Sequence, residues 1–313
     1  MIQARGLTKR YGDKVAVEQL SFEVRPGVVT GFLGPNGSGK STTMRMVMGL
    51  DLPTAGDATI NGRHFHDLAW PMHEVGALLE AKAIHPGRSA RNHLLMLAQT
   101  NRIHPRRVDE VLETVGLTEV ANQRAGKFSL GMGQRLGIAA AMLGDPEVLL
   151  FDEPVNGLDP DGIRWVRTFL KSLAREGRTV FVSSHLMSEM ALTAEEVVII
   201  GKGRLIVQTS IDDLLTQSAR KSVRVSSPDI SGLRSALESD GATTTIEDDG
   251  SLTVRGKDHK AVGELAARLS VVLYELTPQT ESLEEAFMEL TEGSIEYRGT
   301  DVKIANALKE MEQ

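Results

Sequence analysis

The stretch GPNGSGKST, residues 34–42, decides the fold of this chain. It matches the pattern G-x-x-x-x-G-K-[ST] in full. The preceding apolar run, residues 28–34, is predicted as a strand, and the following run, residues 41–49, is predicted as a helix. Glycines in such a loop let successive backbone amides curl around a phosphate. The flanking elements make a chance match in a glycine-rich turn the weaker reading, so we expect a phosphate-binding loop.

All residues of this loop are candidates for nucleotide contacts: Gly34, Pro35, Asn36, Gly37, Ser38, Gly39, Lys40, Ser41 and Thr42. The Lys40 ammonium would reach the outer phosphates and neutralise their charge during binding and reaction. The Ser41 hydroxyl would bind Mg²⁺. The loop therefore predicts both a nucleotide site and part of a metal site.

An acidic pair ends a second apolar run, VLLFDEP at residues 148–154. A continuous apolar run of this kind is expected of a strand buried on both faces. Two successive residues at its end point in different directions. Asp152 can therefore face Mg²⁺ while Glu153 accepts the proton of an attacking water. Such a pair by itself is more often a solvated loop or helix cap, but beside a phosphate loop it predicts a hydrolytic site.

The order of predicted elements divides the chain. Short β-rich runs alternate with helical runs over the first two thirds, which is the layout of an α/β domain. From about Val223 the order is strand, helix, strand, strand, helix, strand, which resembles the α+β ferredoxin-like motif, and a last helix is predicted at residues 282–291. We expect a nucleotide-binding domain at 1–217, a small domain at 222–292 and a polar tail at 293–313.

Composition excludes several classes of protein. The 313 residues are 41% hydrophobic and 25% charged, as in globular proteins. Apolar runs are too short to span a membrane, and the start lacks the apolar core of a signal peptide, so we expect a cytosolic chain. The absence of cysteine excludes disulfides and cysteine-ligated zinc. A formal net charge of −7 argues against a nucleic-acid partner.

Five ordered motifs give residues 2–215 their resemblance to the ATP-binding cassette (ABC) family, the nucleotide-hydrolysing subunits of ABC transporters. The phosphate loop and the acidic pair are two of them. FSLGMGQR at residues 128–135 stands where the family signature belongs, NGLD at residues 156–159 follows the catalytic glutamate, and SSH ends at His185. Tyr11 stands where the family's adenine-stacking aromatic lies.

The resemblance implies a P-loop cassette with a mixed sheet, flanking helices and an α-helical subdomain that carries the signature. It also implies ATP and Mg²⁺ as cofactors and a head-to-tail dimer with a second copy or a related cassette. In such a dimer Ser129, Gly131 and Asp159 would meet the neighbour's ATP. Tyr11 would stack on adenine, and the catalytic group would comprise Lys40, Glu153 and His185, the last touching the γ-phosphate.

Two departures from the family pattern affect the expected site. Leu130 and Met132 replace a glycine and the glutamine of the usual signature L-S-G-G-Q. Glu80 is the best match to a loop glutamine that touches the metal, and a carboxylate there would bind Mg²⁺ more strongly but add negative charge beside the phosphates. The alternative for Glu80 is an exposed acid without a role in the site.

The leading functional interpretation is an ATP-hydrolysing subunit that energises export through a separate membrane permease, which would hold it at the inner face of the membrane. The small domain and the ending resemble the bacterial drug-resistance and ABC-2 type exporters. The alternative is a cassette ATPase that remodels ribosomes or DNA, although such members usually carry two cassettes or long coiled coils. A module that binds nucleotide without turnover is disfavoured because Glu153 is present.

Overall fold

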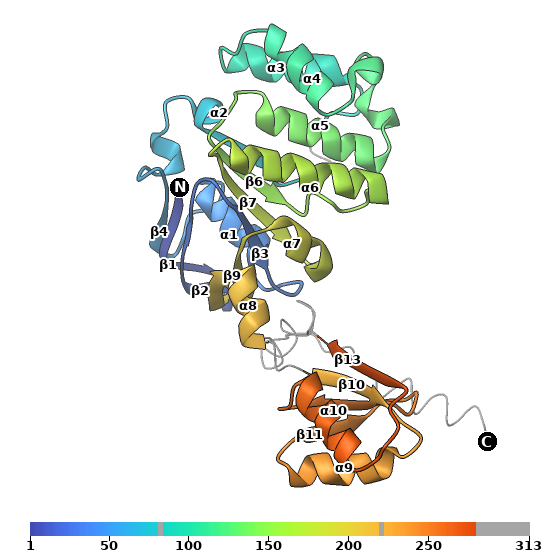
Figure 1. Cartoon of the computed structure of the whole chain (residues 1–313). Helices are drawn as coiled ribbons and strands as arrows, with labels where there is room; N and C mark the ends of the chain where they lie inside the picture. The colour runs from blue at the N-terminus through green and yellow to red at the C-terminus, as the bar shows by residue number, and fades with distance from the viewer. Residues whose placement is uncertain (81–83, 219–221, 280–313) are drawn as a thin grey trace, which may run out of the picture. The chain divides into compact units, whose positions relative to one another are not determined.

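The computed structural model describes residues 1–80, 84–218 and 222–279. They divide into two compact units, and the division falls between Thr209 and Ser210. Figure 1 shows the elements of each unit. The helix predicted at residues 282–291 and the polar tail lie outside the described residues. The domain limits drawn from the sequence therefore stay predictions.

The first unit contains two sheets. An antiparallel sheet has the strand order β2-β1-β4, and a larger sheet has the order β5-β6-β7-β3-β8-β9, whose first five strands run parallel. Their bounds are β1 (Ile2–Tyr11), β2 (Lys14–Val24), β3 (Val29–Leu33), β4 (Ala55–Ile60), β5 (Val75–Leu78), β6 (Val148–Asp152), β7 (Thr179–Ser184), β8 (Glu196–Gly201) and β9 (Arg204–Ser210). Because parallel strands end at one edge, the segments after β3, β5, β6 and β7 meet there.

Helices cover both faces of the larger sheet and form a group beside it. The helix α1 contacts the antiparallel sheet and β6, α6 and α7 pack on β3, and α3, α4 and α5 gather at one side (Figure 1). The bounds are α1 (Lys40–Val47), α2 (Pro71–Glu74), α3 (Ala90–Thr100), α4 (Arg106–Thr114), α5 (Leu130–Met142), α6 (Pro160–Arg175) and α7 (Met187–Thr193), with short 3₁₀ turns η1 (Phe65–Asp67), η2 (Thr118–Val120) and η3 (Ala125–Lys127).

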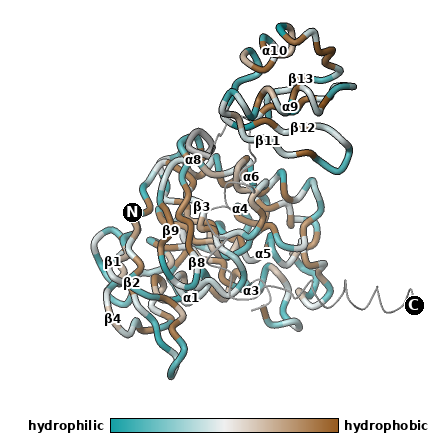
Figure 2. Tube along the Cα trace, turned by 90° about the horizontal axis from the view of Figure 1, so that it is seen from below, coloured by the Kyte–Doolittle hydropathy of each residue, from teal (hydrophilic) through white to brown (hydrophobic). Residues whose placement is uncertain are grey.

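The core of the first unit shows why β3 can be buried on both faces. Phe32 packs against Phe22 and Phe181, with ring centroids 5.6 and 5.0 Å away. The preceding residue faces the other side of the strand, where a Cβ atom at Gly31 would lie 2.6 Å from the sulfur of Met190 on α7. Figure 2 shows the hydrophobic colour along β3 and the neighbouring strand β8. A glycine therefore lets α7 approach the strand that leads into the phosphate loop.

The second unit has the predicted ferredoxin-like order, in a four-stranded antiparallel sheet arranged β11-β12-β10-β13. After α8 (Ile211–Ser218) come β10 (Ser222–Ser226), α9 (Ile230–Ser239), β11 (Thr243–Ile246), β12 (Leu252–Arg255), α10 (His259–Arg268) and β13 (Glu275–Gln279). The last strand starts later than the predicted run at residue 271, because Val271 donates its amide to the carbonyl of Ala266 and closes α10. The predicted fold class, a P-loop α/β cassette with a small α+β domain, is confirmed.

No helix within residues 1–80, 84–218 or 222–279 has the length and apolar character that crossing a bilayer requires.

Candidate functional site

The phosphate loop joins the end of β3 to the start of α1. Gly37 and Gly39 have φ angles of 81° and 103°, a backbone region that other residues rarely adopt. A Cβ atom at Gly34 would collide with the hydroxyl of Ser38 and lie 2.6 Å from the carbonyl oxygen of Ile200. The glycines are thus required by backbone conformation and by close approach, as the pattern predicts.

Lys40 lies inside the curve of the loop. Its Nζ atom donates to the carbonyl oxygen of Gly34 at 2.6 Å and to that of Pro35 at 3.3 Å. Burial lowers the pKa of the Lys40 ammonium, and the charges of Glu153 and Asp152 act in the opposite direction. The residue is only 7% exposed, so its charge acts on the phosphate loop with little screening by water.

The acidic pair is anchored by the next strand of the sheet. Asp152 ends β6 and lies beside Ser183 of the parallel strand β7. The Ser183 hydroxyl donates to Oδ1 of Asp152 and accepts the amide of Glu153 at 3.0 Å. One serine therefore fixes the carboxylate of Asp152 and the backbone that carries Glu153.

Glu153 and His185 form the reactive end of the site. Oε2 of Glu153 lies 2.8 Å from Nδ1 of His185, and the two side chains are 20% and 40% exposed. The backbone of Glu153 has a φ angle of 51°, which is unusual for a residue with a side chain. This conformation ends the alternation of the strand, so Glu153 and Asp152 do not follow the ordinary directions of strand side chains.

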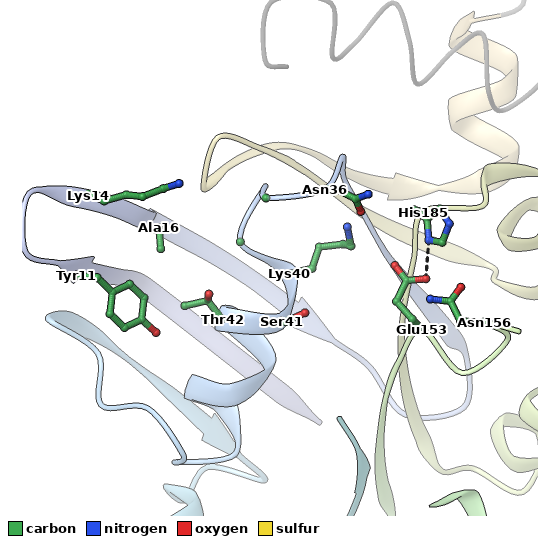
Figure 3. Close-up of a pocket in the computed structure, with 12 residues that line it drawn as sticks. Tyr11, Lys14, Ala16, Asn36, Lys40, Ser41, Thr42, Glu153, Asn156 and His185 are labelled. Atoms are coloured by element: carbon green, nitrogen blue, oxygen red, sulfur yellow. Dashed lines mark hydrogen bonds and ion pairs between the residues drawn. The ribbon is translucent and has the colours of Figure 1, made fainter. Parts of the chain in front are cut away.

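A pocket of about 510 Å³ brings together Tyr11, most of the phosphate loop, Glu153 and His185 from distant parts of the sequence, whereas Asp152 does not line it. Figure 3 shows Tyr11 and Lys14 at one end, Glu153 and His185 at the other, and the loop with Lys40 between them. It is lined by Tyr11, Lys14, Ala16, Asn36, Gly37, Gly39, Lys40, Ser41, Thr42, Glu153, Asn156 and His185. The elongated arrangement suits a ligand with a flat ring at one end and phosphates at the other.

Tyr11 lies at the open end of this pocket. It is 49% exposed, and its hydroxyl donates to Oδ2 of Asp51 at 3.1 Å. The Nζ atom of Lys9 lies 5.0 Å from the ring centroid. Desolvation, followed by the hydrogen bond to Asp51, raises the pKa of Tyr11. An exposed ring held at its hydroxyl can serve as a stacking platform for a base.

The predicted signature residues lie outside the pocket of their own chain. Ser129 is the exposed N-cap of α5, and its Oγ atom accepts the amide of Met132 at 3.2 Å. A Cβ atom at Gly131 would lie 3.1 Å from a methyl group of Leu158. Asp159 caps α6 and accepts the amide of Gly162 at 2.8 Å. None of Ser129, Gly131 and Asp159 lines the pocket that contains Lys40 and Glu153.

Glu80 also lies outside the residues that line the pocket. It is exposed and follows the end of β5 by two positions. The pKa of the Arg45 guanidinium on α1 is raised mainly by its hydrogen bond with Asp51 and more weakly by the charge of Glu80. The assignment of Glu80 as a metal ligand stays a prediction.

The oxygen donors at the phosphate loop fit Mg²⁺. Ser41 lines the pocket with a hydroxyl, and Asp152 offers a carboxylate at the end of β6, which is separated from β3 by β7. Among the residues that the structure describes, no group of three or more His, Cys, Asp or Glu side chains could hold a metal by itself. Mg²⁺ in nucleotide sites uses one or two protein ligands together with phosphate oxygens and waters. The donor set therefore matches a metal that arrives with a nucleotide.

Two supporting residues were not predicted from the sequence. Ser183 holds Asp152 and Glu153, as described above. Gln134 of α5 is 4% exposed, and its Nε2 atom donates to the carbonyl oxygen of Glu153 at 3.0 Å. The available signal was a polar residue in the buried stripe that Gln134 shares with Ile138 and Ala141, at the spacing of one helical face.

Comparisons with known proteins agree with this geometry. A family model described as ABC transporter matches residues 17–156, and one described as a domain of unknown function matches residues 221–284. The chain is 37% identical to the uncharacterized ABC transporter ATP-binding protein YhcH of Bacillus subtilis, over 93% of this chain and 96% of that protein. It is 43% identical to the bacitracin transport ATP-binding protein BcrA of Bacillus licheniformis, over 68% of this chain and 71% of that protein.

A solved structure shares the fold of the first unit. It is a dimeric post-hydrolysis state of the ATP-binding cassette MJ0796 bound to ADP and Pi, with a TM-score of 0.62 and 26% identity. The alignment covers 67% of this chain and 99% of that chain. The similarity thus extends over a whole cassette.

Proposed function

The chain belongs to the family of ABC transporter ATP-binding proteins, and from this premise we propose that it hydrolyses ATP as a head-to-tail dimer and thereby drives export through a separate permease. The observation that carries the proposal is one pocket lined by the phosphate loop, Lys40 and the Glu153–His185 pair. Relatives with transport in their names, such as BcrA, favour this function over the remodelling of ribosomes or DNA.

ATP would bind along the pocket. Tyr11 would receive the adenine ring at the exposed end, where stacking on an aromatic side chain contributes about 1–3 kcal/mol. The amides of residues 34–42 would surround the phosphates, and Lys40 would neutralise their outer charge. Because the glycine conformations are already in place, the loop needs little reorganisation to bind.

Glu153 would act as the general base. Its Oε2 atom is held by His185, which leaves the other carboxylate oxygen to accept a proton from water. His185 would also contact the γ-phosphate from the same side as the attacking water. Ser183 keeps the backbone of Glu153 in place during this step.

Ser41 and Asp152 would hold Mg²⁺, which when bound neutralises charge on the phosphate oxygens. The hydrogen bond from Ser183 orients the Asp152 carboxylate for this task.

The exposed signature would complete the site of a neighbouring subunit. Ser129 and Gly131 lie away from the pocket of their own chain, at the start of a helix whose amides and dipole favour anions. Asp159 would approach the same interface. ATP binding would close the dimer and hydrolysis would release it, because the ligand stabilises the state to which it binds. A membrane permease would hold the dimer at the inner face of the membrane and convert this motion into transport.

The test is Glu153→Gln, which keeps the size of the side chain and removes the base. We expect ATP binding to persist, turnover to fall by roughly 10²-fold or more, and a dimer to remain on size exclusion with ATP. Glu176→Gln is the matched control, because Glu176 pairs with Arg178 just beyond the end of α6 and does not line the pocket. Parental turnover in the Glu153→Gln protein would remove Glu153 from the mechanism.

A further inference from the structure

Gln134 is a buried polar residue whose side-chain amide contacts the backbone of Glu153. Its Nε2 atom donates to the carbonyl of Glu153, but its Oε1 atom is buried and has no hydrogen-bond partner within the described residues. An unsatisfied buried polar atom costs about 1–3 kcal/mol. An apolar side chain of the same size would avoid this cost. The polar group at this position is directed at the backbone of Glu153.

Glu153, to which Gln134 donates, has a strained backbone conformation. Glu153 has a φ angle of 51°, which costs a residue with a side chain about 1–2 kcal/mol. Its amide is held by Ser183 at 3.0 Å, and its carbonyl accepts both Gln134 at 3.0 Å and the amide of Asn156 at 3.2 Å. Hydrogen bonds on both sides of Glu153 fix the direction of its side chain.

The same helix touches the loop that follows Glu153 at two further points. A Cβ atom at Gly157 would collide with the side chain of Leu130, and one at Gly131 would lie 3.1 Å from Leu158. Leu130, Gly131 and Gln134 lie on the first two turns of α5. Residues 153–158 thus pack against the start of the signature helix.

We propose that Gln134 is a positioning residue for Glu153, through which the signature helix of a subunit sets the direction of that subunit's own base. The inference rests on the proposed function, in which Glu153 is the base and the signature meets the neighbour's ATP. Contact of that ATP with α5 would then change the position of Glu153 in the same chain. The two ATP sites of a dimer are coupled by this hydrogen bond.

Two substitutions separate positioning from packing. Gln134→Leu fills the same space without a donor, and we expect kcat to fall about tenfold with little change in KM, as for the loss of one hydrogen bond. Gln134→Glu presents a carboxylate to a carbonyl oxygen, and burial raises its pKa. Below that pKa the protonated acid donates to Glu153 again; above it the donor is lost.

The decisive measurement is the ratio of kcat for Gln134→Glu to kcat for Gln134→Leu between pH 6 and pH 8. The groups facing Glu153, namely Lys40, Asp152 and His185, are present in both proteins, so the ratio removes the part of their titration that does not depend on residue 134. We expect the ratio to increase severalfold as the pH falls. A ratio that stays constant, or a Gln134→Leu protein with parental kcat, would overturn the proposal.

Gln208→Leu is the matched control. Gln208 also donates its side-chain amide to the backbone carbonyl of a glutamate, Glu23, at 2.7 Å, but neither residue lines the pocket. Its loss should leave kcat unchanged. The Glu153→Gln protein distinguishes failure of the proposed function from failure of the positioning role. If Glu153→Gln turns over ATP normally, the proposed function is wrong. If Glu153→Gln is inactive and Gln134→Leu has parental turnover, only the positioning role is wrong.

Discussion

The chain contains two glycine- and serine-rich segments at helix starts, and they differ in what surrounds them. The phosphate loop before α1 curves around a lysine that is 7% exposed, and a side chain at Gly34 would meet backbone. The signature before α5 begins at an exposed serine, and Leu130 is 48% exposed. Its basic residue, Arg135, is directed elsewhere: it donates to the carbonyl of Val115 and lies over the ring of Trp165.

This difference indicates how much of a phosphate site one subunit supplies. A loop with converging amides and a buried cation can bind phosphate by itself. The second helix start offers amides and one hydroxyl beside a pocket of about 370 Å³, and no lysine or arginine is among the described residues that line this pocket. We expect the second segment to act only when another subunit brings the phosphate to it.

The largest effect is expected from Lys40→Ala. Losing the buried ammonium removes charge neutralisation in binding and in reaction, so ATP turnover should decrease by about 10³-fold. Lys14→Ala, which removes the same charge from another wall of the pocket, should cause a much smaller decrease. A steady-state ATPase assay compares the two proteins. Equal losses of turnover would contradict a specific role of the Lys40 ammonium in neutralising the phosphates.

A mixed dimer tests whether the second segment completes a neighbour's site. One subunit carries Lys40→Ala and the other Gly131→Asp, with Glu153→Gln in both to prevent release. In a head-to-tail dimer one site collects both defects and the other has none, so the mixture should retain about one nucleotide per dimer, and neither variant by itself should retain it. The aspartate opposes an approaching phosphate by charge and by bulk.

The measurement for the mixed dimer is nucleotide kept after rapid gel filtration of differently tagged subunits. The tags report how many mixed dimers form. If these dimers form and retain no more nucleotide than the separate variants, the signature does not contribute to the neighbouring site.

A smaller effect is expected from Gly157→Ala, which tests how the signature packs on its own chain. The new methyl group would meet Leu130, and the φ angle of 72° adds strain. We expect a loss of about 2–3 kcal/mol in the free energy of unfolding. Gly62→Ala has a φ angle of 78° and open space around it, so it should cost about 1 kcal/mol.

Urea denaturation measures both glycine variants. Combining Gly157→Ala with Leu130→Ala should reduce its cost to that of the Gly62 control, since the collision is then removed. A double mutant in which the two losses simply add would mean that Leu130 and Gly157 are not in contact.

The smallest effect is expected from Glu80→Gln. The exposed position of Glu80 outside the pocket lining predicts turnover and Mg²⁺ dependence within about twofold of the parent, as for most surface substitutions. Asp152→Asn serves as the comparison and should clearly raise the Mg²⁺ concentration needed for half-maximal turnover. A comparable shift in the Glu80 variant would place its carboxylate by the metal.

The parts of the site that the sequence predicts are those carried by contiguous residues. The chemistry of the phosphate loop can be predicted from residues 34–42 alone, and that of the acidic pair from Asp152 and Glu153. The flanking apolar runs predict the strands that position them. Their meeting at one sheet edge follows from parallel strand order. The ferredoxin-like order of the small domain is local in the same sense.

The supporting contacts could not be predicted because they join segments far apart in the chain. Gln134 and Glu153 are separated by 19 positions, and Ser183 and Asp152 by 31. The left-handed conformation of Glu153 contradicts the local preference of glutamate and exists because these contacts hold it. The contact of Leu130 with Gly157 joins the start of α5 to a loop 27 positions later, so the sequence shows the substitution in the signature but not the residue that it contacts.

The left-handed backbone conformation of Glu153 lowers the stability of the fold at the same residue whose side chain the activity requires. Glycine adopts this conformation without penalty, so a chain selected for robustness of folding would drift toward glycine at position 153. Such a chain would lose its proton acceptor. Selection for thermostability should therefore be accompanied by an activity screen, because the strain at this position is part of what makes the protein a catalyst.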